Sequence, residues 1–89
     1  MQETFGIAAF RSRQQVMRFE GALRRAGIPS QVISTPRDVS IGCGLSVQFD
    51  IRDKARVFEV YRQTRPSNLI GFYYVVRDGH ARPQISPLM

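Results

Sequence analysis

Two strand–helix–strand halves follow one another in a chain of only 89 residues, and this order limits the possible folds more than any other feature. Each half has an apolar segment of strand type, then apolar side chains at helical spacing, then a second strand-type segment. The four strand-type segments are Phe5–Phe10, Gln31–Ile33, Leu45–Phe49 and Leu69–Val76. A chain of this length has room for one domain, so both halves must build the same core.

Capping residues and helix breakers mark the ends of the two helices. The first begins after Ser12, which forms the S-x-x-Q pattern of a capping box with Gln15, and it ends at Gly27. The second begins after Asp50 and stops before Pro66. Interleaved as two split βαβ units, these elements predict an α+β fold, a ferredoxin-like βαββαβ sandwich. Its four-stranded antiparallel sheet has the order 4-1-3-2, with both helices on one face.

The end of the chain differs from the rest. It contains an Asp-Gly pair, Pro83 and Pro87, which are typical of turns and loosely held termini. We therefore expect a single ferredoxin-like domain over residues 1–76 and a loosely ordered C-terminal tail over residues 77–89.

Several classes of protein are excluded by simple counts. No apolar run approaches the roughly 18 residues of a membrane helix, and the start of the chain lacks the basic-then-apolar form of a secretory signal. A single cysteine cannot form an internal disulfide and cannot alone hold a zinc ion. The sequence therefore predicts a soluble, cytoplasmic protein with no metal, no cofactor and no membrane partner.

The charge of the chain is strongly positive. Thirteen basic residues against seven acidic ones give a net charge of +6, and every basic residue except Lys54 is an arginine. Such a surface attracts nucleic acid, acidic proteins or anionic ligands. A merely solvated surface would have the same composition, so charge alone does not identify the partner.

The segment between the second and third predicted strands carries the densest candidate chemistry. Cys43 lies between Gly42 and Gly44, so no neighbouring side chain shields its sulfur. Glycines also permit positive φ values, which allow successive amide hydrogens to converge on an anion. A thiolate, a persulfide or a selenide anion would suit such a loop. The alternative is a small buried cysteine whose glycines only serve a tight turn.

The predicted topology places this loop at the same edge of the sheet as the start of the first helix. The sulfur should then lie near Ser12, where the helix dipole is positive. Three arginines are expected at the same edge: Arg11, Arg13 and Arg37. Positive potential lowers the pKa of a thiol and makes the thiolate available as a nucleophile near neutral pH.

Residues 33–45 (I-S-T-P-R-D-V-S-I-G-C-G-L) resemble the P-R-x-(aliphatic)-S-x-x-C-G signature of the selenium/sulfur carrier-like proteins, a family of small bacterial domains. Residues 26–29 are similar to the A-G-I-P turn that follows the first helix in that family. The resemblance covers most of the chain and implies that Cys43 is the carrier residue. It also implies that the residues shaping its loop are Pro36, Arg37, Ser40 and Gly44.

The leading interpretation is therefore a one-cysteine carrier. Cys43 would accept sulfur or selenium from a donor protein as a persulfide or selenopersulfide, and would pass it to an acceptor protein. Arg37 and the amide groups around Gly42 and Gly44 would stabilise the terminal anion. The sequence favours such a carrier, or a binding protein, over a stand-alone enzyme.

The alternative is a small basic module without chemistry that binds RNA or protein. RNA recognition by this element order normally uses aromatic side chains on the open face of the first and third strands. Here the third strand offers Ser46 and Gln48 to one face, and Phe10 is the one aromatic candidate at the end of the first strand. A homodimer through the open sheet face is also compatible with the sequence. Its apolar area would come from Tyr73 or Phe72 together with Val75 or Val76.

Overall fold

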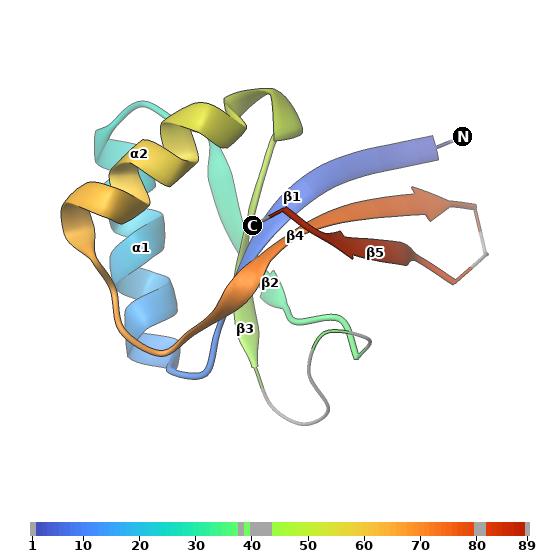
Figure 1. Cartoon of the computed structure of the whole chain (residues 1–89), viewed down its shortest axis with the longest axis horizontal. Coiled ribbons are helices and arrows are strands. Elements are labelled where there is room, and N and C mark those ends of the chain that lie inside the picture. Colours follow the sequence, from blue (N-terminus) through green and yellow to red (C-terminus); the bar gives the residue numbers. More distant parts are fainter. Residues whose placement is uncertain (1, 38, 40–43, 80–81, 89) are drawn as a thin grey trace.

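An antiparallel sheet and two helices make up the computed structural model of this chain (Figure 1). The structure describes residues 2–37, 39, 44–79 and 82–88. The elements in chain order are β1 (Gln2–Phe10), α1 (Arg13–Arg25), β2 (Ser30–Ser34), β3 (Leu45–Phe49), the short 3-10 helix η1 (Ile51–Asp53), α2 (Lys54–Thr64), β4 (Leu69–Asp78) and β5 (Gln84–Pro87). No helix in the described chain has both the length and the apolar character that a membrane crossing requires.

The sheet of the described chain has five strands in the order β2-β3-β1-β4-β5. The predicted α+β class is confirmed, but the prediction of four strands is wrong. β1 to β4 lie in the order 2-3-1-4, which is 4-1-3-2 counted from the other edge, and β5 adds a strand beside β4. β5 escaped prediction because it is short, contains one apolar residue (Ile85) and ends in Pro87. An edge strand tolerates proline, since its outer N–H groups have no partner strand.

Both helices cover one face of the sheet, and the aromatic core lies beneath them (Figure 1). Its centre is Phe72 of β4, which is 1% exposed. Phe58 and Tyr61 of α2 pack edge-on against this ring, with centroid distances of 4.9 and 5.2 Å. Phe19 of α1 approaches the same ring at 6.3 Å. Edge-to-face packing of this kind adds to the stabilisation from burial alone, and it ties both helices to one strand.

A second, smaller cluster lies on the opposite face of the sheet. Its buried members are Phe5, Ile7 and Val75, and the residues packed against them include Val39 and Ile85. Alternate residues of a strand face opposite sides, so Ile7 points away from the side that Ala8 shares with the helices. Val39 of the β2–β3 loop and Ile85 of β5 therefore cover part of the sheet face that was expected to be open.

Two of the residues proposed for a dimer interface are buried, one on each face of the sheet. Phe72 is 1% exposed beneath the helices, and Val75 is fully buried in the second cluster. Neither side chain is available to a second copy of the chain. The interpretation of the sheet face as an open apolar surface is therefore wrong at these positions.

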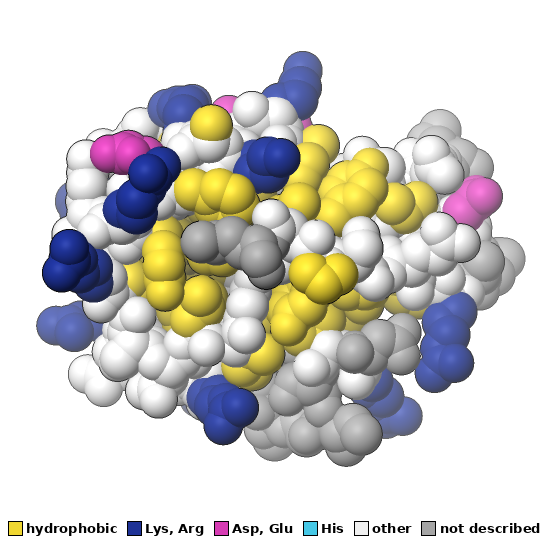
Figure 2. Space-filling view, viewed as in Figure 1, with side chains coloured by type: hydrophobic (Ala, Val, Ile, Leu, Met, Phe, Trp, Pro, Cys, Tyr) yellow, Lys and Arg dark blue, Asp and Glu magenta, His cyan; other side chains and the backbone are white. Residues whose placement is uncertain are grey.

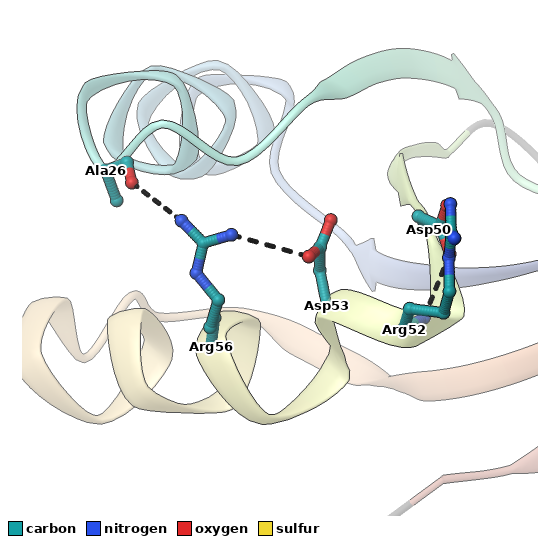
Figure 3. Close-up of polar contacts among 5 residues, drawn as sticks. All are labelled: Ala26, Asp50, Arg52, Asp53 and Arg56. Atoms are coloured by element: carbon teal, nitrogen blue, oxygen red, sulfur yellow. Dashed lines mark hydrogen bonds and ion pairs between the residues drawn. The ribbon is translucent and has the colours of Figure 1, made fainter.

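The first helix begins as predicted, and the second does not. Ser12 is the N-cap of α1, and its hydroxyl accepts a long hydrogen bond of 3.4 Å from the backbone N–H of Gln15. Asp50 caps η1 instead of α2, because one 3-10 turn precedes the α-helix. Its carboxylate accepts from the backbone N–H of Arg52 at 2.9 Å. The start of α2 is held by Arg56, which donates to the carbonyl oxygen of Ala26 at 3.1 Å (Figure 3).

Candidate functional site

The described ends of the loop between β2 and β3 are joined by their backbones. The N–H of Thr35 donates to the carbonyl oxygen of Gly44 at 3.0 Å. The N–H of Val39 donates to the carbonyl oxygen of Pro36 at 3.0 Å, which makes a turn in the first half of the loop. We call Thr35, Gly44 and Ser46 the loop base, because these residues connect the loop to the sheet.

A buried hydroxyl pair fixes the loop base. The hydroxyl oxygens of Thr35 and Ser46 lie 2.7 Å apart, and the two residues are 8% and 0% exposed. Each hydroxyl satisfies the other where water does not reach. The sequence did not indicate this pair, because Ser46 has the alternating position of a solvent-facing residue on a half-buried strand.

Gly44 lies where the two chain segments approach closely at the loop base. A Cβ at this position would lie 3.1 Å from Oγ1 of Thr35 and 3.8 Å from the carbonyl oxygen of Phe10. Any larger residue would push the hydroxyl of Thr35 away and disturb its contact with Ser46. This glycine therefore has a packing role in holding the loop base against β1.

The loop base lies at the end of the sheet where α1 begins. Phe10, the last residue of β1, pairs with Leu45 on one side and with Leu69 on the other. Beyond Phe10, the backbone N–H of Arg11 donates to the carbonyl oxygen of Asn68 at 2.9 Å. The start of α1, the loop base and the turn before β4 therefore meet at one end of the sheet.

The electrostatic character of this end is positive. Ser12 caps α1, Arg13 is its first residue, and its first turn contains no acidic residue. The positive end of the helix dipole is therefore not offset by a carboxylate in that turn. Arg37, in the loop itself, is exposed.

The other predicted site residues divide into two groups. Pro36 is partly buried and accepts the turn hydrogen bond of Val39 through its carbonyl oxygen. Three further residues lie outside the described part of the chain: Ser40, Gly42 and Cys43. The structure thus positions the ends of the loop, the start of α1 and Arg37, and it leaves the placement of the sulfur as a prediction.

The described residues support neither RNA binding through the sheet nor a metal site. The aromatic side chains of the first and third strands are buried and cannot stack with bases: Phe5 is 4%, Phe10 0% and Phe49 2% exposed. Among the described residues, no three carboxylate, histidine or cysteine side chains gather closely enough to hold a metal ion.

The opposite end of β3 has a different kind of polar contact. Asp50 lies there, and its carboxylate forms an ion pair of 2.8 Å with Nη2 of Arg52 (Figure 3). Side-chain and backbone hydrogen bonds from Arg52 lower the pKa of Asp50 to about 2. Both groups are exposed, and the pair organises the η1 turn away from the loop base.

Comparison with known proteins identifies the family. The family model described as "Putative Se/S carrier protein-like" matches residues 5–67, which run from β1 to the turn after α2 and include the whole cysteine-containing loop. No match was found among curated proteins or among solved structures. The matched segment covers more than half of the chain, and the chain belongs to the Se/S carrier protein-like family.

Proposed function

We propose that this protein carries one sulfur or selenium atom on Cys43 between a donor protein and an acceptor protein. The family match supports the proposal most directly, because it spans the cysteine-containing loop and the start of α1 together. The family description suggests selenium or sulfur carriage, and Cys43 is the one cysteine of the chain. The thiol is therefore the group on which a covalent carrier of this family would hold its cargo.

The transfer is an exchange between sulfur atoms. The thiolate of Cys43 attacks the terminal sulfur of a cysteine persulfide on the donor. The new S–S bond forms as the donor's S–S bond breaks, and the donor cysteine leaves as a thiolate. The hydrogen on the terminal sulfur moves with it, so the step has no net oxidation and needs no cofactor. A thiolate of the acceptor then repeats the exchange, and a terminal selenium atom follows the same course.

The surroundings of the loop base favour the anionic forms that this exchange requires. The uncompensated start of α1 lies beside the loop base, and Arg11 and Arg13 flank its N-cap. Positive potential of this kind stabilises a thiolate and a persulfide anion. In the proposal, Arg37 and the amide groups at Gly42 and Gly44 complete the anion site, while Pro36 and Ser40 shape the loop.

We also infer that the domain is a ferredoxin-like sandwich extended by β5. The order of β1 to β4 and the position of both helices on one face support this assignment. In that arrangement the β2–β3 loop and the start of α1 share one end of the sheet, as the geometry around Phe10 requires. The assignment therefore agrees with the proposed placement of Cys43.

Mass spectrometry of the intact protein tests the carrier proposal. After incubation with inorganic polysulfide, the wild-type chain should gain the mass of one sulfur atom, which dithiothreitol should remove. Cys43→Ser should gain nothing. Arg37→Gln should gain sulfur more slowly, whereas Arg52→Gln, an exposed arginine at the other end of β3, should react like the wild type. A folded wild-type chain that takes up sulfur no faster than the urea-unfolded chain would contradict the proposal.

A further inference from the structure

A groove of about 720 Å³ runs between α1 and the segment that follows α2. Four arginines line it, together with an exposed methionine and a glycine in the middle of α1. These residues are Arg18, Arg24, Arg25, Arg65, Met17 and Gly21. No aspartate or glutamate is among its lining residues. Several basic side chains are also spread over the helical side of the molecule in Figure 2.

The arginines of the groove have few partners within the described chain. Arg24 forms an ion pair of 3.4 Å with Glu20, and no carboxylate of the described residues pairs with Arg18, Arg25 or Arg65. We call these three the groove arginines. A concave surface with several uncompensated positive charges attracts and orients an anionic partner.

Gly21 lies in the lining of the groove, next to the guanidinium groups of Arg24 and Arg25. Glycine in the middle of a helix costs stability relative to alanine, because its backbone loses more conformational freedom on folding. Here a Cβ would meet only arginine side chains, at 3.3 Å from Nη1 of Arg25 and 3.9 Å from Nη2 of Arg24. The missing side chain therefore leaves room for the guanidinium group of Arg25 over the helix surface.

The apolar side chains of the groove favour a protein partner over a nucleic acid. Met17 is 54% exposed, and it is the one exposed large hydrophobic residue in the described chain. Exposed methionine adapts to varied apolar side chains at protein-binding surfaces. Phe19, the aromatic residue of the lining, is 1% exposed and cannot stack with a base.

The groove also leads toward the loop base. One wall of the groove is formed by residues 64–67, and Asn68 follows directly in the chain. The carbonyl oxygen of Asn68 accepts from Arg11, at the end of the sheet where the loop base lies. A segment held in the groove would therefore bring the protein to which it belongs close to the carrier loop.

We propose that this groove binds an acidic segment of a partner protein, with carboxylates on the groove arginines and an apolar side chain on Met17. The identity of that partner as the sulfur or selenium donor or acceptor rests on the proposed function. The binding itself does not, because it involves neither Cys43 nor its chemistry.

Fluorescence anisotropy with the full chain tests the proposal. The probe is a fluorescein-labelled peptide of repeating Glu-Glu-Leu sequence. Arg18→Gln with Arg25→Gln should weaken its binding by about fivefold, as expected for two exposed ion pairs. The control, Arg52→Gln with Lys54→Gln, removes the same number of charges outside the groove, one in η1 and one at the start of α2, and should change the affinity far less. Circular dichroism verifies that each variant is folded.

Two further variants separate the parts of the groove. Met17→Ala should weaken the binding of the leucine-containing peptide and leave the binding of an all-glutamate peptide unchanged. Gly21→Ala keeps every charge but displaces the guanidinium group of Arg25. It should weaken the binding of both peptides by about twofold, which is a smaller loss than removing the charges would cause.

The outcomes that overturn the proposal are distinct. Equal losses in the groove and control variants would mean that net charge alone attracts the peptide. An oligouridylate of matching charge that binds more tightly, and depends on Arg18 and Arg25, would identify nucleic acid as the occupant. Absence of peptide binding by the wild type would also overturn it. Cys43→Ser should bind the peptide normally, so failure of sulfur carriage would leave this result standing.

Discussion

The two ends of β3 hold their neighbours by opposite means. At the loop base, the uncharged hydroxyls of Thr35 and Ser46 meet at 2.7 Å in a buried position. At the other end, Asp50 and Arg52 form an exposed ion pair of 2.8 Å. Water competes with the exposed pair, whereas a buried hydroxyl has no substitute for a lost partner. Burial, and not formal charge, therefore decides which contact matters more to the fold.

The largest effect should follow from breaking the buried pair. Thr35→Val or Ser46→Ala leaves one hydroxyl buried without a partner, which should lower the free energy of unfolding by about 1–3 kcal/mol. The double variant should lose less than the sum of the two single variants, because no unsatisfied hydroxyl remains. Urea unfolding of all four proteins measures this coupling. Strictly additive losses would show that the two hydroxyls do not depend on each other.

Removing the arginine that joins the helices should have an intermediate effect. Arg56 donates to the carbonyl oxygen of Ala26 at 3.1 Å and to Asp53 at 3.4 Å (Figure 3). Because the side chain is more than half exposed, Arg56→Ala should lower the free energy of unfolding by only about 0.5–1 kcal/mol. Sulfur uptake by Cys43 should not change. A loss as large as that of Ser46→Ala would contradict the ranking by burial.

The smallest effect should come from the exposed ion pair, and it should depend on pH. The pKa of Asp50 falls from 3.8 to about 2 in the folded chain because Arg52 hydrogen-bonds to its carboxylate. A lowered pKa means that this stabilisation is present above pH 3.8 and is lost as the pH falls toward 2. Arg52→Gln should remove this part of the acid dependence in urea unfolding. At neutral pH, it should perturb stability less than Arg56→Ala, and a larger loss would reverse the comparison.

The elements of the fold differ in how well the sequence predicts them. Periodic apolar residues predicted both helices and the first four strands, and Ser12 marked the start of α1. β5 was missed because its pairing with β4 depends on the folded sheet and its own pattern is weak. Local patterns are sufficient for elements with a strong apolar repeat, and they fail where the partner supplies most of the stabilisation.

The site was less predictable than the fold. Thr35 and Ser46 have no motif, because their pairing depends on two strands meeting at the loop base. The net charge of +6 was compatible with an anionic partner and with a merely solvated surface, and it could not distinguish arginines with ion-pair partners from the groove arginines. Cys43 and its flanking glycines form a pattern that is local in the sequence, and the role of the thiol stays a prediction because Cys43 lies outside the described residues.

The most direct measurement on the carrier proposal is the titration of the Cys43 thiol. The rate of alkylation by iodoacetamide, recorded against pH for the folded and the urea-unfolded chain, gives the pKa in each state. We expect the folded chain to have a pKa clearly below the value of about 8.5 for a free cysteine, and unfolding to raise it. A folded-state pKa at or above about 8.5, unchanged by urea, would contradict the carrier site.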